Sequence, residues 1–382
     1  MNSKERVRRA FHFEKPDRIP MSCMNLSTDF FPVSQFQPKT WQPREYPPHI
    51  PGGIFNLAKK YYRLIIYDWD KKNRNDLGFE KKWWKKAHIS INEWGVLWKS
   101  SGTEGEDLTK GHPFKGPLQD SWDYLDDYQI PDSSDPKRYR LVKTKLWKLL
   151  GKNRYTVGEL SANGFFNLCS QIRGFNNVLI DFARNPHKLE ILIKKIFPFF
   201  YNQIEGFKKY FPNLNSIIVA DDFGTQHSPF ISPQIFSKFF KKAYKDIINL
   251  THDLEMDFIL HSCGQILELM PNFVKIGVDV FEFDSPLMTG ILNIKNFAEN
   301  RKCAFWLSSN IQSTYTNGNP EDIEDEIKFF IKNIGNYKGG LSIYEYPSNR
   351  VLGTPKENII AQRNAVKKWG KYNDNGIIEW LN

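Results

Sequence analysis

From about residue 154 the chain alternates short apolar segments with longer amphipathic ones, and this pattern constrains the fold more than any other feature. The apolar segments are YTVGEL (155–160), SIIVADD (216–222), DFILHSC (257–263), DVFEF (279–283), CAFWLSSN (303–310) and GLSIYEY (340–346). Helical patterns lie between them, and three stand out, at 186–211, 232–255 and 319–335. Strand–helix alternation with short connections predicts a parallel sheet covered by helices.

The strand count favours a barrel over an open sheet. RIPMSCMN (18–25) and one strand somewhere in the irregular first half bring the number of predicted strands to about eight. We therefore predict an α/β fold, a single (β/α)₈ TIM-type barrel over residues 1–382 with an elaborated N-terminal region. Residues 1–150 form its irregular part, with a hairpin at 88–102, and residues 151–382 form the regular repeats. A doubly wound sheet is the alternative, but no Gly-x-Gly-x-x-Gly follows any strand and there is no Walker A motif.

Composition and charge limit the kinds of partner that we expect this chain to bind. The net charge of +10 comes from dispersed lysines, which are typical of solvated helix faces, so we expect no nucleic-acid partner. No run of 18 apolar residues occurs, and the basic N-terminus lacks the apolar stretch of a secretion signal. The four cysteines are scattered. These features predict a reduced, cytoplasmic protein without a membrane partner.

Polar residues follow the apolar segments at the points where the predicted strands end. They are Glu159, Asp221, Asp222, His261, Cys263, Asp284, Asn310 and Glu345. Charge at the edge of a buried strand is costly unless it has a purpose, and strand ends meet at one face of a barrel. The sequence therefore predicts a site at that face. The alternative is that the Asp and Asn residues cap the helices that follow.

His261 and Cys263 are the first candidates for metal ligands. Residues two apart on a strand point to the same side, with Cα atoms roughly 6.5–7 Å apart. Both side chains could therefore bind one Zn²⁺, and Gly264 allows a tight turn after them. A buried cysteine beside a hydrogen-bonded histidine is the simpler reading of the same pattern. The spacing alone indicates no third ligand.

Segments along essentially the whole chain resemble one protein family. They are KERVRRAFHFEKPDRIP (4–20), INEWGVLW (91–98), IRGFNNVLIDFARNP (172–186), DDFGTQHSPFISPQIFSKFFKKAYKDII (221–248), ILHSCGQILELMPNFVKIGVDVFEF (259–283) and GTPKENIIAQRNAVKKWGKY (353–372). The chain resembles the uroporphyrinogen decarboxylase superfamily, and within it the branch that contains the cobalamin-dependent methyltransferases. The resemblance also implies a single (β/α)₈ barrel.

The resemblance implies a zinc site. Methyltransferases of this superfamily bind zinc through a His-x-Cys pair, which His261 and Cys263 match, and through a later cysteine. That later position falls at or near Ser348, and serine is a poor zinc ligand. Glu345, three residues earlier, is the expected substitute. Asp222, Glu159 and Cys303 are alternatives.

One departure from the family pattern and one missing sequence motif bear on the expected activity. Uroporphyrinogen decarboxylases carry Arg-Gln-Ala-Gly-Arg after the first strand, whereas MSCMNLSTDF (21–30) has no arginine, which argues against porphyrinogen decarboxylation. The resemblance then implies a zinc-assisted methyltransferase acting on a small-molecule methyl donor or acceptor. No Asp-x-His-x-x-Gly motif is present, so a corrinoid would come from a partner protein.

Roles follow for the remaining polar residues. Asp221 and Asp222 are the expected catalytic residues, which position the substrate or orient His261. The expected substrate-binding residues are Glu159, Gln226, Asn310 and Ser348. Two alternatives remain open at this point. One is a decarboxylase or lyase in which Asp222 donates a proton, and the other is a non-catalytic subunit that binds a corrinoid protein.

Overall fold

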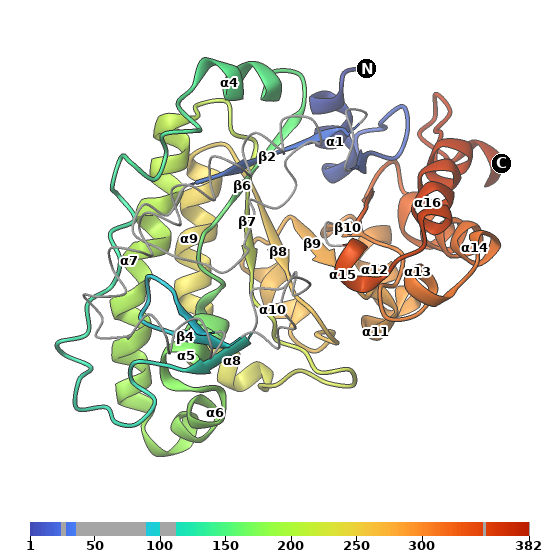
Figure 1. The fold of residues 1–382 in the computed structure, drawn as a ribbon. Coiled ribbons are helices and arrows are strands. Elements are labelled where there is room, and N and C mark those ends of the chain that lie inside the picture. The colour runs from blue at the N-terminus through green and yellow to red at the C-terminus, as the bar shows by residue number, and fades with distance from the viewer. Residues whose placement is uncertain (24–27, 36–88, 100–111, 347–348, 382) are drawn as a thin grey trace.

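Eight parallel strands form a nearly closed barrel surrounded by helices (Figure 1). The computed structural model describes residues 1–23, 28–35, 89–99, 112–346 and 349–381. The strand order is β1-β11-β10-β9-β8-β7-β6-β2. The strands are β1 (Met21–Ser22), β2 (Phe30–Ser34), β6 (Tyr155–Glu159), β7 (Ser216–Ala220), β8 (Asp257–His261), β9 (Val280–Phe283), β10 (Ala304–Leu307) and β11 (Leu341–Tyr344). The predicted (β/α)₈ fold is confirmed, and β2 is the strand expected in the irregular first half.

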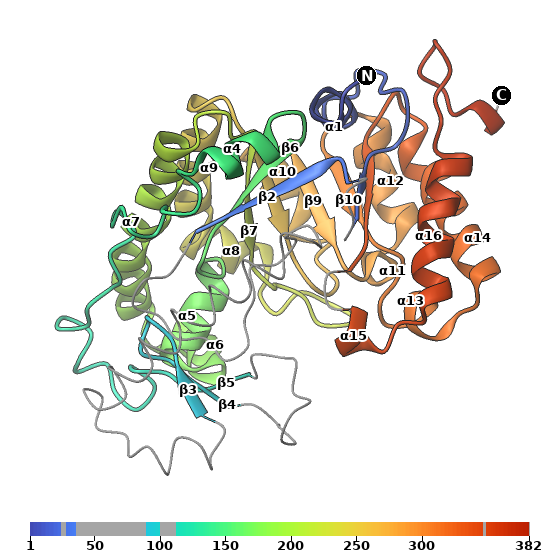
Figure 2. The same cartoon turned by 45° about the horizontal axis from the view of Figure 1, so that its top comes forward.

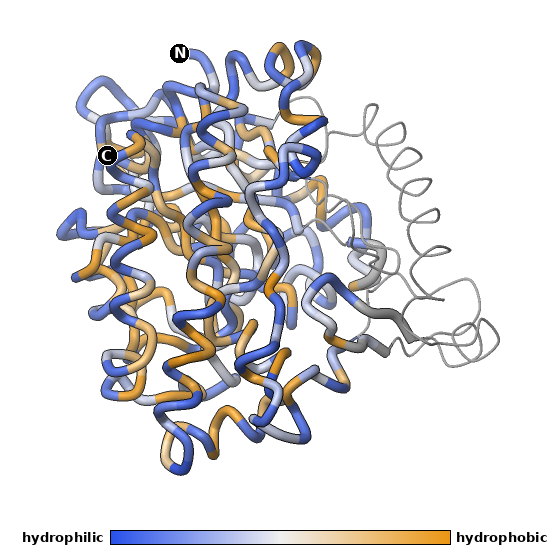
Figure 3. The backbone as a smooth tube through the Cα atoms, turned by 90° about the vertical axis from the view of Figure 1, so that its left-hand side faces the viewer, coloured by the Kyte–Doolittle hydropathy of each residue, from blue (hydrophilic) through white to orange (hydrophobic). Residues whose placement is uncertain are grey.

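Helices cover the outside of the barrel. They are α4 (Lys145–Gly151), α5 (Phe165–Arg173), α6 (Phe175–Arg184), α7 (Pro186–Tyr210), α8 (Pro233–Phe239), α9 (Lys241–Asp253), α10 (Met270–Lys275), α11 (Pro286–Thr289), α12 (Ile291–Glu299), α13 (Thr314–Asn317), α14 (Pro320–Phe330), α15 (Asn349–Leu352) and α16 (Lys356–Trp369). Apolar and polar residues alternate along these helices, as Figure 3 shows, because one side packs on the sheet. In the part of the chain that the structure describes, no helix is long and apolar enough to span a membrane.

Two of the expected helices show how local sequence sets their ends. The Asn319 side chain accepts hydrogen bonds from the first turn of α14, and the Asp322 carboxylate accepts one from the Asn319 N–H, which completes a capping box. The helix expected over 232–255 is instead two helices that meet at Phe240. The Phe240 ring is fully buried against the rings of Phe166 and Phe182, so the break lets it enter the aromatic core.

A small antiparallel sheet lies beside α5 near the open end of the barrel (Figure 2). It consists of β3 (Ile89–Ile91), β4 (Leu97–Lys99) and β5 (His112–Lys115), in that order. The turn between β3 and β4 forms because the Asn92 side chain accepts hydrogen bonds from the N–H groups of Trp94 and Val96, at 3.0 and 3.1 Å. The hairpin predicted within 88–102 is therefore confirmed, and β5 extends it.

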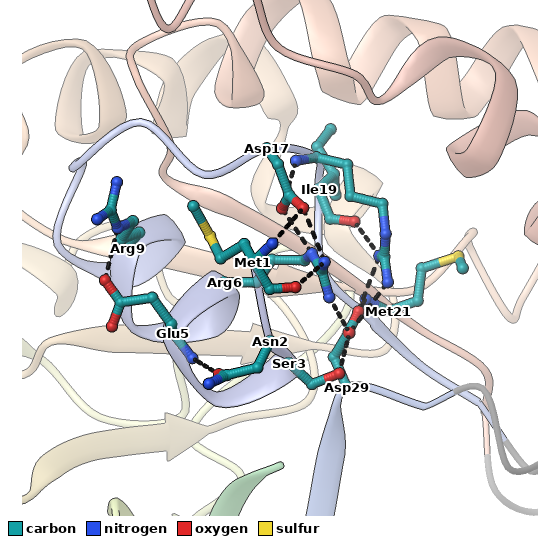
Figure 4. Close-up of polar contacts among 11 residues, drawn as sticks. Met1, Asn2, Ser3, Glu5, Arg6, Arg9, Asp17, Ile19, Met21 and Asp29 are labelled. Atoms are coloured by element: carbon teal, nitrogen blue, oxygen red, sulfur yellow. Dashed lines mark hydrogen bonds and ion pairs between the residues drawn. The ribbon is translucent and has the colours of Figure 1, made fainter. Parts of the chain in front are cut away.

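Helix α1 (Ser3–Phe11) closes the end of the barrel opposite the strand carboxyl ends. Its buried residues Val7 and Phe11 belong to the same apolar cluster as the inward-facing side chains of the strands, including Tyr155 and Ile259. A network around Asp29 holds this helix in place (Figure 4). The fully buried Asp29 carboxylate accepts hydrogen bonds from Arg6, Arg18, Ser3 and the Met21 N–H, at 2.7–3.0 Å.

Replacing Asp29 should destabilise the whole barrel. Asp29→Ala leaves two arginines without their buried anion, and breaking a buried ion pair costs about 3–5 kcal/mol. Urea unfolding should show that loss. Asp246→Ala removes an exposed pair with Lys242 and should cost less than about 1 kcal/mol. Equal losses in the two variants would contradict this role for Asp29.

Candidate metal centre

The pairing of β8 with β9 sets the orientation of His261. His261 and Glu282 are partners in the parallel register, and both lie at the strand ends that face the open end of the barrel. Their side chains meet, with His261 Nδ1 2.7 Å from Glu282 Oε2. A carboxylate on one ring nitrogen fixes the tautomer and directs the other nitrogen outward. His261 Nε2 is therefore left to bind at the barrel mouth.

Cys263 follows two residues later on the same side. Its Sγ lies 3.4 Å from His261 Nε2 and 3.8 Å from Asp284 Oδ2. The turn after it requires glycine, since Gly264 has a φ of +78° and a Cβ there would lie 2.3 Å from the Gly224 oxygen. The loops after β7 and β8 therefore pack backbone to backbone, and this packing holds Cys263 in place.

Asp222 joins the pair from the end of β7. Its Oδ1 accepts a hydrogen bond from the Cys263 N–H at 2.8 Å and lies 3.6 Å from His261 Nε2. Its other oxygen accepts one from Asn167 Nδ2 on α5, at 3.2 Å. The Asp222 carboxylate is thereby fixed against both His261 and Cys263.

These side chains form two overlapping groups of possible metal ligands among the described residues. One group is Asp222, His261 and Cys263, the other is His261, Glu282 and Asp284, and within each group one ligand atom per residue lies within 4.8 Å of the others. Tetrahedral ligand atoms at about 2.0–2.3 Å from Zn²⁺ lie roughly 3.3–3.8 Å apart. The contacts of His261 Nε2, at 3.4 and 3.6 Å, fit that spacing, and nitrogen, sulfur and carboxylate oxygen are the ligands that zinc takes.

The electrostatics of the site favour a cation. Burial raises the pKa of the Cys263 thiol to about 12, although His261 opposes this. Burial alone would lower the pKa of His261, but the charges of Glu282, Cys263 and Asp284 raise it well above its ordinary value. Burial likewise works to raise the pKa of Asp222, yet His261 and the Cys263 N–H hold that pKa well below its usual range. A metal would replace the protons of His261 and Cys263 and relieve this crowding.

Asp221 lies apart from the cluster although it is next to Asp222. It is fully buried, and its carboxylate accepts hydrogen bonds from Tyr244 Oη and from the N–H groups of Phe166 and Asn167, at 2.6–2.9 Å. Adjacent residues at a strand end point to opposite sides, so Asp221 faces outward and caps α5. Gly164 permits this because a Cβ there would lie 2.3 Å from Asp221 Cβ. The structure therefore gives Asp221, expected to be catalytic, an anchoring position.

The structure does not bring Glu345 to His261 and Cys263. Glu345 is absent from both groups of possible ligands, and its carboxylate is instead paired through both oxygens with Arg363 on α16. Cys303 immediately precedes β10 and so lies at the opposite end of the barrel from Cys263.

Three expected substrate-binding residues lie elsewhere or outside the described chain. Gln226 is exposed in the turn after β7. Asn310 is buried in the segment that follows β10, where its N–H donates to Glu326 and its Nδ2 donates to Ser313. Ser348 lies outside the described residues.

Glu159 lies inside the barrel, where its Oε2 accepts a hydrogen bond from Ser34 at 2.7 Å. It lines a small cavity together with Trp306 from β10. Burial, opposed by Ser34 and reinforced by the charge of Glu282, raises the pKa of Glu159 to about 8. The side chain is therefore near the metal group without belonging to it.

Sequence reasoning placed Asp284 among the strand-end residues of the predicted site without giving it a role, and it missed Glu282. The apolar segment 279–283 predicts a strand, and Val280, Glu282 and Asp284 alternate along it, so they share the inward face. The sequence feature that could have identified Glu282 is a carboxylate within an otherwise apolar strand segment. The contribution of Asn167 carried no such signal, because it depends on where α5 packs.

Comparisons with known proteins identify the family. The sequence model described as uroporphyrinogen decarboxylase (URO-D) matches residues 110–369, about two thirds of the chain. The chain therefore belongs to the uroporphyrinogen decarboxylase family. A search of curated proteins gives no match.

Solved structures agree on the fold. A methyltransferase from Methanosarcina mazei superposes with a TM-score of 0.60 at 14% identity, covering 96% of this chain and 99% of that one. At that identity the likeness supports the shared barrel alone. A D-psicose 3-epimerase covers 64% of this chain and 85% of its own at 9% identity, with a TM-score of 0.36, and adds nothing to the argument.

The raised pKa of Glu159 gives a testable pH dependence. Its folded pKa of about 8 exceeds the value near 4.3 in an unfolded chain, so the folded state binds more protons between these values and loses stability as pH rises from about 5 to 8. Glu159→Gln removes this loss, so its stability relative to wild type should grow over that range. Urea unfolding at pH 5.5, 7 and 8.5 measures it, with exposed Glu268→Gln as the control. A difference that stays constant or shrinks would refute the assignment.

Proposed function

We propose that this chain is a zinc-assisted, corrinoid-linked methyltransferase that acts on a small methylated substrate. The observation that carries the proposal is the cluster of Asp222, His261 and Cys263, in which His261 Nε2 lies at the spacing of a tetrahedral zinc site from the other two ligand atoms. Asp222 takes the place of the third ligand that the sequence expectation gave to Glu345. Three protein ligands leave one position for substrate, which is the arrangement of a catalytic zinc.

Each residue of the cluster has a role in this proposal. Bound zinc supplies a Lewis acid that lowers the pKa of an acceptor thiol or polarises a methylated heteroatom. Glu282 orients His261 through Nδ1, and Asn167 orients Asp222. We assign to Asp284 the proton that an acceptor thiol releases, because its Oδ2 lies 3.8 Å from Cys263 Sγ and Tyr344 holds its other oxygen.

Methyl transfer of this kind needs no additional oxidant or reductant. A methylated corrinoid would supply the methyl group: the lone pair of an acceptor sulfur would form the new C–S bond, and the electron pair of the broken Co–C bond would stay with the corrinoid. The thiol proton passes to Asp284. The corrinoid would be carried by a partner protein at the barrel mouth.

The contacts of Asp222 with the Cys263 N–H and with His261 weigh against the decarboxylase alternative. That alternative requires Asp222 to donate a proton, but its surroundings hold its pKa well below the usual range. An ionised carboxylate has no proton to give at neutral pH. The same charge suits a metal ligand.

Metal binding tests the proposed centre. Wild-type protein loaded and freed of excess metal should hold one zinc per chain by elemental analysis. Glu282→Gln, which loses only the partner of the ligand, should weaken zinc by about 10–100-fold in a chelator competition. His261→Ala, Cys263→Ser and Asp222→Asn should each weaken it further.

Matched controls separate the cluster from other residues. Cys303→Ser, His252→Ala and Glu345→Gln should keep wild-type zinc affinity, because none of these side chains belongs to either ligand group. Zinc lost in Glu345→Gln and retained in Asp222→Asn would restore the original assignment. Absence of zinc from fully metallated wild type would overturn the proposal.

The proposed proton acceptor gives a separate kinetic test. With methylcobalamin as donor and 2-mercaptoethanol as acceptor, zinc-loaded protein should convert the methylcobalamin absorption spectrum. Asp284→Asn leaves the proposed ligands Asp222, His261 and Cys263 in place, so it should keep zinc but lower the rate by about 10²–10⁴-fold, the usual contribution of a general base. An unchanged rate in Asp284→Asn would contradict the role given to Asp284.

A further inference from the structure

A cavity of about 410 Å³ opens beside the metal cluster, between the β4–β5 hairpin and α5. Asp222 lines its inner end, so the cavity and the cluster share one side chain. Figure 2 shows the small sheet lying against α5 and α6 at this end of the barrel. Ligand clefts span roughly 300–1,000 Å³, so this one suits a small molecule.

One face of α5 is polar and turns toward this cavity. Asn167, Ser170, Gln171 and Gly174 line it and recur at helical spacing, while Leu168 and Ile172 on the other side are buried in the core. Asn163, just before the helix, lines it as well.

Several of these polar groups have no partner within the described residues. Ser170 Oγ is buried without a hydrogen bond. The side chains of Gln171 and Asn163 also form no hydrogen bond within the described residues, and unlike Ser170 Oγ their polar atoms reach solvent. Buried polar groups are normally paired, and an unmade bond at such a site is costly. A ligand with both donors and acceptors would pair them.

The remaining walls are aromatic. Trp98, Phe114 and Phe175 line the cavity, and the last two are more than a third exposed. Phe175 is braced from behind by the ring of Phe230, with centroids 4.9 Å apart. Aromatic faces of this kind favour a planar ligand.

The charges argue against an anion. Among the described residues that line the cavity, Lys115 is the one cation, and it is paired with Asp120 at 2.7 Å, whereas Asp222 adds a carboxylate. In the metal-free protein a carboxylate or sulfonate would meet that negative charge, and the described lining residues offer no unpaired cation to offset it. A quaternary ammonium would leave the amides of α5 unpaired. A neutral ligand satisfies both conditions.

We propose that this cavity binds the small-molecule substrate, and that the substrate is a neutral, planar aromatic molecule carrying hydroxyl, ether or amide groups. The ring lies between Trp98 and Phe175, its polar substituents pair with Asn163, Ser170 and Gln171, and one substituent reaches Asp222 and the metal. The catalytic role of that last contact rests on the proposed function, whereas ligand binding in the cavity does not require metal.

Calorimetry on the full-length protein tests the proposal with three probes of similar size. They are neutral 2-methoxyphenol, anionic 4-hydroxy-3-methoxybenzoate and cationic phenyltrimethylammonium. The neutral probe should bind at least about tenfold more tightly than either ion. Gln171→Leu, which keeps the volume of the side chain, should weaken it about 3- to 10-fold through the lost hydrogen bond. Phe175→Ala should weaken it as well, and exposed Gln129→Leu should not.

Each measurement is made on metal-free and on zinc-loaded protein, so the two proposals fail separately. Binding of the neutral probe without zinc affinity would sink the metal centre and leave the cavity assignment standing. Zinc affinity without probe binding up to 10 mM would overturn the cavity assignment alone. Tighter binding of either ion, or no effect of Gln171→Leu, would also overturn it.

Discussion

The hydrogen bond between His261 and Glu282 is the interaction on which the site depends. It crosses from β8 to β9 at a point that the parallel register fixes, 2.7 Å long and shielded from solvent. A carboxylate that is shielded from water is costly without a cation beside it, so the orientation of His261 that contacts Glu282 is favoured. That orientation sends Nε2 to Cys263 and Asp222. A shift of β9 by one residue against β8 would turn Glu282 away from the lumen and break this contact.

The barrel tolerates so many ionisable groups at its mouth because each has a partner from a neighbouring element. Cys263 donates its backbone N–H to Asp222, and Tyr344 donates its hydroxyl to Asp284. Asn167 adds a hydrogen bond from α5. These contacts leave the ligand atoms crowded around one point, as a metal centre requires, whereas the opposite end of the barrel is filled by apolar side chains of α1.

The fold could be predicted because it depends on patterns that local sequence carries. Apolar segments of strand length alternate with amphipathic helices, and the barrel follows from their number. The pair His261 and Cys263 could be found for the same reason, since two residues two apart on a strand share a side. Glu345 looked equivalent at another strand end. Its partner Arg363 lies on α16, and the sequence around Glu345 does not predict that pairing. Asp221 and Asp222 differ only in which side of the strand end they face, a difference that a pair of adjacent aspartates does not reveal.

The central claim is that Asp222, His261 and Cys263 hold one zinc ion, and X-ray absorption at the zinc edge of loaded protein tests it most directly. The account predicts one sulfur neighbour at about 2.3 Å and nitrogen and oxygen neighbours at about 2.0–2.2 Å, including imidazole, in a four-coordinate shell. Cys263→Ser should remove the sulfur. A shell of oxygen alone, or one with two sulfurs, would contradict the account.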